Sequence, residues 1–138
     1  MNRGHAARSL PDRPLVLIAE DDENTRAMYA FALSANGFDV AIANDRKNLR
    51  ARATELLPDI IVAELDGRAG QDWTLVHDLT HDPRTVRIPV VLLTRLPVPM
   101  VRERAEREGC AALCVKPCTP DVLAVGLRAV LERQAGSG

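Results

Sequence analysis

Apolar and polar residues alternate in blocks along this chain of 138 residues. Short, nearly continuous apolar runs are followed by longer segments in which apolar residues recur three and four positions apart. A short apolar run between polar residues predicts a buried strand, and the longer spacing predicts a helix with one buried face. The predicted strands lie at residues 14–19, 38–43, 60–64, 88–94 and 111–115.

Residues that begin or end helices mark the predicted helix boundaries. Asn44 or Asp45 can cap the second helix, and Thr119 followed by Pro120 predicts the start of the fifth. Pro97 and Pro99 are expected to delay the start of the fourth helix. The apolar residues that follow helical spacing in the first helix are Met28, Phe31, Ala32 and Ala35.

Five strands that alternate with helices predict an α/β fold. We expect a single (βα)5 domain, a doubly wound parallel sheet with helices on both faces. The domain is expected to span residues 14–134, between flexible tails at residues 1–13 and 135–138. In such sheets, functional side chains gather at the carboxyl ends of the strands.

Polar side chains stand at the ends of four predicted strands. They are Glu20 and Asp21 after the first strand, Glu64 at the third, Thr94 at the fourth and Lys116 at the fifth. Carboxylates gathered at one edge repel each other and favour a cation between them. Mg²⁺ suits such an all-oxygen pocket, and a lysine with a hydroxyl opposite the acids can hold phosphoryl oxygens. The strand ends therefore predict a site for magnesium and phosphoryl chemistry.

Four segments, in order, resemble the receiver domain of bacterial two-component response regulators. They are "VLIAEDDENTR", "PDIIVAEL", "IPVVLLT" and "GCAALCVKPCTPDVL". Glu64 precedes Thr94 by 30 residues, and Thr94 precedes Lys116 by 22, both usual separations in that family. The resemblance covers about residues 14–134. It implies the flavodoxin-like receiver fold and a role in phosphorelay signal transduction.

The resemblance also implies roles for individual residues. Glu20 and Asp21 take the metal-binding acidic positions, and the backbone carbonyl of Asp66 takes the third, so Mg²⁺ is the implied cofactor. Thr94 takes the switch position and Lys116 that of the lysine that contacts the phosphoryl group. The proline after this lysine commonly follows a cis bond in the family. The implied partners are a sensor histidine kinase, a phosphotransfer protein or another signalling protein.

Glu64 stands where receivers carry the aspartate that accepts phosphate. Its extra methylene moves the carboxylate outward by about 1.5 Å, and a misplacement of about 1 Å can slow a reaction about 100-fold. The longer side chain can instead reach Lys116 or Thr94. Further departures from the family pattern are Arg68 for a proline, Leu113 for the switch aromatic and Cys118 for a phenylalanine.

The sequence leaves three interpretations of Glu64 open. In the favoured one, the chain is an atypical pseudo-receiver that acts by protein–protein interaction, with Glu64 holding it near one conformation. In the second, Glu64 or Asp66 is phosphorylated. In the third, the site is vestigial and Glu64 is a solvated acid. We expect no enzyme: an Asp-x-Asp phosphohydrolase, which "ELDG" faintly resembles, is disfavoured because such enzymes need aspartate first.

The net charge and the positions of apolar residues indicate which kinds of partner the chain can bind. The net charge is −1, without the basic excess of a nucleic-acid binder, and "AEDDEN" would repel nucleotide phosphates. The resemblance makes the fourth helix, last strand and fifth helix the usual partner face, which can also serve a homodimer. On this face we expect Val98, Met100, Val101 and Leu113.

Composition predicts a cytoplasmic protein. The apolar runs are too short to span a bilayer and the N-terminus lacks a signal peptide. No DNA-binding helix pair follows Leu131, so we expect no output domain. The cysteines form no Cys-x-x-Cys pair and the histidines lie elsewhere, which predicts reduced structural thiols and no zinc site. These residues are Cys110, Cys114 and Cys118, and His5, His77 and His81.

Overall fold

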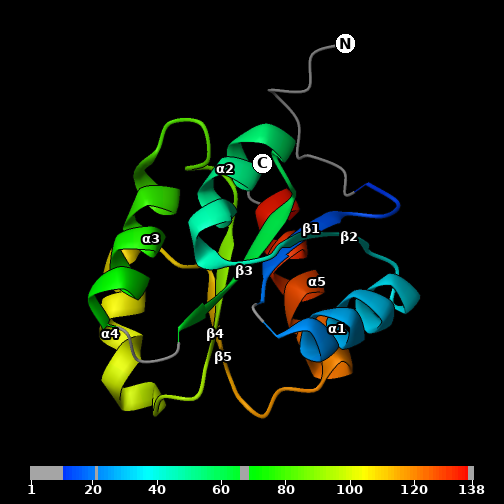
Figure 1. Cartoon of the computed structure of the whole chain (residues 1–138). Helices are drawn as coiled ribbons and strands as arrows, with labels where there is room; N and C mark the ends of the chain where they lie inside the picture. Colours follow the sequence, from blue (N-terminus) through cyan, green and yellow to red (C-terminus); the bar gives the residue numbers. More distant parts are fainter. Residues whose placement is uncertain (1–10, 21, 66–68, 137–138) are drawn as a thin grey trace.

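The computed structural model describes residues 11–20, 22–65 and 69–136. In this part of the chain, five strands alternate with five helices (Figure 1). The strands are β1 (Leu15–Ala19), β2 (Asp39–Ala43), β3 (Ile60–Leu65), β4 (Val90–Thr94) and β5 (Ala112–Val115). The helices are α1 (Glu23–Ala35), α2 (Arg46–Leu56), α3 (Ala69–His81), α4 (Val98–Glu108) and α5 (Pro120–Gly136).

The five strands form one parallel sheet in the order β2-β1-β3-β4-β5. This confirms the predicted doubly wound fold. The strand order changes direction between β1 and β3, which is where such sheets carry their functional residues. Because the strands are parallel, their carboxyl ends share one edge.

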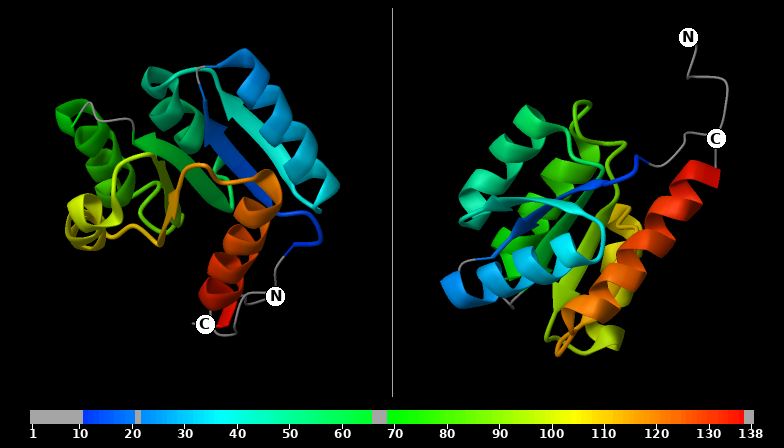
Figure 2. Two further views of the ribbon diagram at one scale, coloured as in Figure 1. Left: turned by 90° about the horizontal axis from the view of Figure 1, so that it is seen from below. Right: turned by 90° about the vertical axis from the view of Figure 1, so that its right-hand side faces the viewer.

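Different helices cover the two faces of the sheet (Figure 2). On one face, α1 and α5 contribute Leu33 and Leu127 to a core that also holds Val62 of β3. On the other face, α2, α3 and α4 surround a second core that includes Leu49 and Leu79. Side chains alternate between faces along each strand, so β1, β3 and β4 contribute to both cores.

Side-chain caps fix two of the helix starts. The carboxylate of Asp45 accepts a hydrogen bond from the backbone N–H of Asn48 at 3.0 Å, so Asp45 rather than Asn44 caps α2. The hydroxyl of Thr119 accepts from the N–H of Val122 at 3.3 Å, which confirms Thr119 as the cap of α5. These bonds satisfy N–H groups that have no partner within the helix.

The structure decides which apolar residues of α1 and α4 face the core. In α1, Met28 is 47% exposed and Phe31 is 79% exposed, while Tyr29 and Leu33 are buried. Both sets have helical spacing, so only the position of the sheet decides which one faces inward. Val101 is 2% exposed and packs in the core of α2, α3 and α4, so it is not part of a partner surface.

Three boundaries also differ from expectation. Arg13, which the sequence places in the tail, donates to the carbonyl of Phe38 at 2.7 Å and to the carboxylate of Asp39 at 3.0 Å. Helix α4 begins at Val98, because a proline in the first turn lacks only an N–H that has no helical partner there. Helix α5 runs to Gly136, past the domain end expected at residue 134.

Within the described ranges, no helix combines the length and apolar character needed to cross a membrane.

Candidate functional site

The carboxyl edge of the sheet brings four predicted site residues together. Glu20 follows β1 directly, and Glu64 and Thr94 lie within the last two residues of β3 and β4. Lys116 follows β5. The four strands are neighbours in the sheet, so side chains up to 96 positions apart in sequence share one edge. The four residues therefore lie along the predicted edge of the sheet.

Glu64 and Lys116 form an ion pair across this edge. The ammonium Nζ of Lys116 donates a hydrogen bond to Oε2 of Glu64. The Glu64 side chain is 24% exposed and that of Lys116 is 12% exposed, so water screens the two charges only partly. The prediction that Glu64 can reach Lys116 is confirmed. A carboxylate in this pair has its charge compensated by the lysine.

Thr94 is fully buried at the end of β4. Its hydroxyl accepts a hydrogen bond from the N–H of Leu96 at 3.0 Å, and its carbonyl accepts from the N–H of Lys116 at 2.7 Å. The backbone of Thr94 thus fixes the position from which the lysine side chain starts. The bond between Lys116 and Pro117 is cis, as the resemblance implied.

Glu20 is held between β1 and the start of α1. It is 7% exposed, and its Oε2 accepts a hydrogen bond from the N–H of Asp22 at 3.1 Å. Its carbonyl accepts from Nη1 of Arg26, also at 3.1 Å. The first turn of α1 therefore orients this carboxylate from both its side chain and its backbone.

The donors at this edge agree in type with a magnesium site. Glu20 offers carboxylate oxygens, which Mg²⁺ binds together with water. The charge of Glu64 is already balanced by Lys116. Asp21 and Asp66, the other two predicted ligands, lie outside the described residues. Glu20 is thus the predicted ligand whose placement the structure gives, and it fits this ion.

The hydrogen bond of Tyr29 and the packing of Leu113 are two features near the site that the sequence did not predict. The hydroxyl of Tyr29 donates to the carbonyl of Cys118 at 3.0 Å, tying α1 to the loop before α5. Burial raises the pKa of this phenol, which keeps it protonated as a donor. Leu113 is half-buried and packs against the core of α2, α3 and α4. The signal for Tyr29 was its position four residues before Leu33, on the same helical face.

The comparison of sequences finds curated relatives of this chain. The chain is 30% identical over 118 residues to the phosphate regulon transcriptional regulatory protein PhoB of Escherichia coli (strain K12). The match covers 86% of this chain and 52% of that protein. The chain therefore spans about half the length of the curated relatives it matches. No protein-family model matches the chain.

Solved structures share the arrangement of the strands and helices. The chemotaxis response regulator CheY4 of Vibrio cholerae superimposes with a TM-score of 0.76 at 23% identity, over 86% of this chain and 98% of that one. The signal receiver domain of a signal transduction histidine kinase from Syntrophus aciditrophicus gives a TM-score of 0.72 at 26% identity. That match covers 87% of this chain and 91% of the other.

Proposed function

Because the sequence similarity and the fold support a response regulator receiver domain of two-component signalling, we propose that this chain acts as a pseudo-receiver. In this proposal it works by binding a signalling protein, without phosphorylation of an aspartate and without enzymatic activity of its own. Glu64 occupies the position of the phosphoacceptor.

The ion pair between Glu64 and Lys116 is the observation that carries this proposal. In a receiver, the lysine at this position contacts the phosphoryl group. Here its ammonium already donates to the carboxylate that replaces the phosphoacceptor. A phosphoryl group on this carboxylate would have to take over the ammonium that now balances the carboxylate charge. The pair therefore favours one state of the site over a phosphorylation cycle.

This state differs in charge from a phosphorylated receiver. Glutamate carries a charge of −1, whereas a phosphoryl group carries about −1.5 to −2 and three acceptor oxygens. The hydroxyl oxygen of Thr94 accepts a hydrogen bond from the N–H of Leu96 within the local turn. Glu64 thus keeps the site in a fixed arrangement without reproducing the charge of the phosphorylated one.

A partner would be a sensor histidine kinase, a phosphotransfer protein or a second copy of the chain. Exposed apolar residues on α4, β5 and α5 support this face as its docking surface. They are Met100 (68% exposed), Val115 (40%), Val122 (61%) and Val125 (71%). Singly exposed apolar residues are ordinary, but these four lie on three consecutive elements.

Magnesium, if it binds, would be held by Glu20 with Asp21 and the carbonyl of Asp66. When bound, it would supply positive charge to oxygens at this edge. Glu20 is oriented for this by its bond from the N–H of Asp22. The ammonium of Lys116 would continue to compensate the negative charge of Glu64.

The test is intact-mass spectrometry after incubation with acetyl phosphate and Mg²⁺. The unmodified protein is compared with Glu64→Asp, which restores the family's phosphoacceptor, and with Glu64→Gln as the control that cannot form a carboxyl phosphate there. We expect no phosphoryl adduct on the unmodified protein and an adduct on Glu64→Asp. An adduct on the unmodified protein that Glu64→Gln abolishes would overturn the proposal. An adduct that persists in Glu64→Gln would also overturn it and would direct peptide mapping to Asp66.

A further inference from the structure

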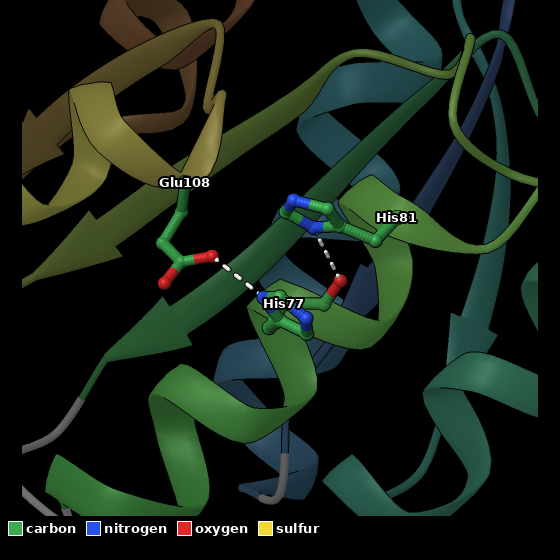
Figure 3. A group of neighbouring side chains, drawn as sticks. All are labelled: His77, His81 and Glu108. Atoms are coloured by element: carbon green, nitrogen blue, oxygen red, sulfur yellow. Dashed lines mark hydrogen bonds and ion pairs between the residues drawn. The ribbon is translucent and has the colours of Figure 1, made fainter.

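A second group of chemistry-bearing side chains lies away from the carboxyl edge of the sheet. His77 and His81 stand on the last turns of α3, and Glu108 is the last residue of α4 (Figure 3). Both helices end where the chain turns back toward the start of the next strand. The group therefore lies toward the amino ends of β4 and β5, opposite the edge with Glu64.

The three side chains converge on a small volume. One possible ligand atom from each residue lies within 4.8 Å of the others. Nδ1 of His77 is 3.1 Å from Oε1 of Glu108, and the two imidazole rings stack with centroids 3.9 Å apart. Histidines four positions apart share one face of a helix, the spacing that lets two imidazoles bind one metal ion.

Hydrogen bonds around the group orient its members. Nδ1 of His81 is 3.0 Å from the carbonyl oxygen of His77 and 3.0 Å from Oγ1 of Thr80. A histidine that donates Nδ1–H to a backbone carbonyl presents its other nitrogen to a metal. Oε2 of Glu108 accepts from Nε of Arg104 at 3.5 Å, which leaves Oε1 facing His77.

Burial differs within the group in a way that suits ion entry. The side chain of His77 is 55% exposed, while that of Glu108 is only 14% exposed. A negative carboxylate that is largely shielded from water thus lies beside two accessible imidazoles. A cation that reaches the histidines from solvent would meet a charge that water screens weakly.

We propose that His77, His81 and Glu108 form a Zn²⁺ site that joins α3 to α4. The two imidazole nitrogens and one carboxylate oxygen would be the protein ligands, and water would complete a tetrahedron. Bonds of about 2.0–2.2 Å require ligand atoms closer together than the upper distance in this structure, so side-chain rotations must draw them inward. The ion would take the place of the hydrogen bond between His77 and Glu108.

The donor types favour Zn²⁺ over the alkaline-earth ions. Mg²⁺ and Ca²⁺ take oxygen ligands, whereas imidazole suits zinc and its neighbours in the first transition series. The proposed site is thus chemically separate from the carboxylate edge near Glu20. It does not rest on the proposed pseudo-receiver function, so either can fail alone.

Calorimetric titration with ZnCl₂ tests this site on the untagged, reduced protein with excess Mg²⁺ present. The variants are His77→Gln, His81→Gln and Glu108→Gln, and the matched control is His5→Gln, which removes a histidine far from the group in sequence. We expect one Zn²⁺ to bind the unmodified protein and His5→Gln alike. Each of the three variants should weaken binding at least about tenfold, because each removes one of three protein ligands.

Trp73 offers a second readout of where the ion binds. It is the one tryptophan of the chain, and it precedes His77 by four residues on α3. Cu²⁺, which prefers imidazole ligands even more strongly, should quench its fluorescence in the unmodified protein and in His5→Gln but not in His77→Gln. Absence of Zn²⁺ binding, or binding that survives all three substitutions, as a cysteine site would, overturns the proposal.

Discussion

One methylene group separates Glu64 from the aspartate expected at its position. The longer side chain carries the same charge but places it where Lys116 can donate to it directly. From the sequence, Lys116 and Thr94 were equally reachable. In the structure the carboxylate contacts the Lys116 ammonium, while the buried hydroxyl of Thr94 accepts from the N–H of Leu96. Local backbone geometry of this kind is not encoded in residue spacing.

The ion pair should stabilise the folded state measurably. We expect Lys116→Met and Glu64→Gln each to lower the free energy of unfolding by about 1–2 kcal/mol, because each leaves a partly buried charge without its partner. The double variant should lose less than the sum, with a coupling energy of about 1 kcal/mol from urea titrations.

An exposed pair provides the control for this cycle. Arg52 and Glu55 are 3.0 Å apart on α2 with side chains 39% and 67% exposed, so their coupling should be about 0–0.5 kcal/mol. A coupling at Glu64 and Lys116 no larger than this would show that the contact does not hold the site in one state.

The three thiols should be poorly reactive in the folded protein. Burial raises the pKa of Cys110 to about 12 and that of Cys114 to about 11, and it also raises the pKa of Cys118. Since the thiolate is the nucleophile, Cys110 should react with Ellman's reagent at pH 8 at least about 100-fold more slowly than in guanidinium. Single Cys→Ser variants assign the phases, and a Cys110 that reacts at its unfolded rate would contradict this.

At the scale of single elements, the cap of α2 separates two residues that the sequence could not. Asp45 accepts from the N–H of Asn48 at 3.0 Å, and the neighbouring Asn44 is exposed. We expect Asp45→Ala to lower the free energy of unfolding by about 1 kcal/mol. Asn44→Ala should change it by less than about 0.5 kcal/mol, as surface substitutions usually do. Chemical denaturation measures both, and equal effects would mean that the cap bond contributes nothing.

The turn after α3 should make the free energy of unfolding depend on pH in the acid range. Hydrogen bonds from the side chain and the N–H of Arg84 hold the pKa of Asp82 well below its usual value, and Arg50 of α2 adds a weaker contact. A lowered folded pKa stabilises the protein above the unfolded pKa of about 3.9, and this contribution is lost as the pH falls below it.

Asp82→Asn should therefore flatten the acid limb of the stability curve. Urea titrations at several pH values from about 5 down to about 3 measure this, because the difference between variant and unmodified protein should shrink as the pH falls. Asp12→Asn, at an exposed position before β1, is the control. A constant difference across this range would exclude the linkage.

The proposed Zn²⁺ site depends first on the spacing of the two histidines of α3. These histidines lie apart from the three cysteines in the sequence, and for that reason the sequence predicted no zinc site. Read as i and i+4 on one helix, His77 and His81 already share a face. The third residue, Glu108, comes from α4. Only tertiary packing brings its Oε1 to 3.1 Å from Nδ1 of His77. A contact between separate helices has no counterpart in local spacing.

At the scale of the whole molecule, periodicity predicted the five strands and the parallel sheet that they form. Short apolar runs such as that at Ile60, alternating with longer segments of helical spacing, favour strands covered on both faces, and the structure pairs them in a parallel sheet. The inward face of α1 did not follow from the sequence. Tyr29 with Leu33 and Met28 with Phe31 both have near-helical spacing, and only the docked sheet decides between them.

The two cores should unfold as one unit, because β1, β3 and β4 send alternate side chains into both of them. Leu127→Ala empties a site beneath α5 and Leu79→Ala a site beneath α3, and both leucines are fully buried. Each change should lower the free energy of unfolding by about 2–5 kcal/mol. Calorimetry should show a single transition with equal calorimetric and van't Hoff enthalpies in the unmodified protein. In each variant this transition should move as a whole, since losing one helix layer exposes strands that the other layer needs. A Leu127→Ala protein that melts in two steps would mean that each face of the sheet is stable without the other.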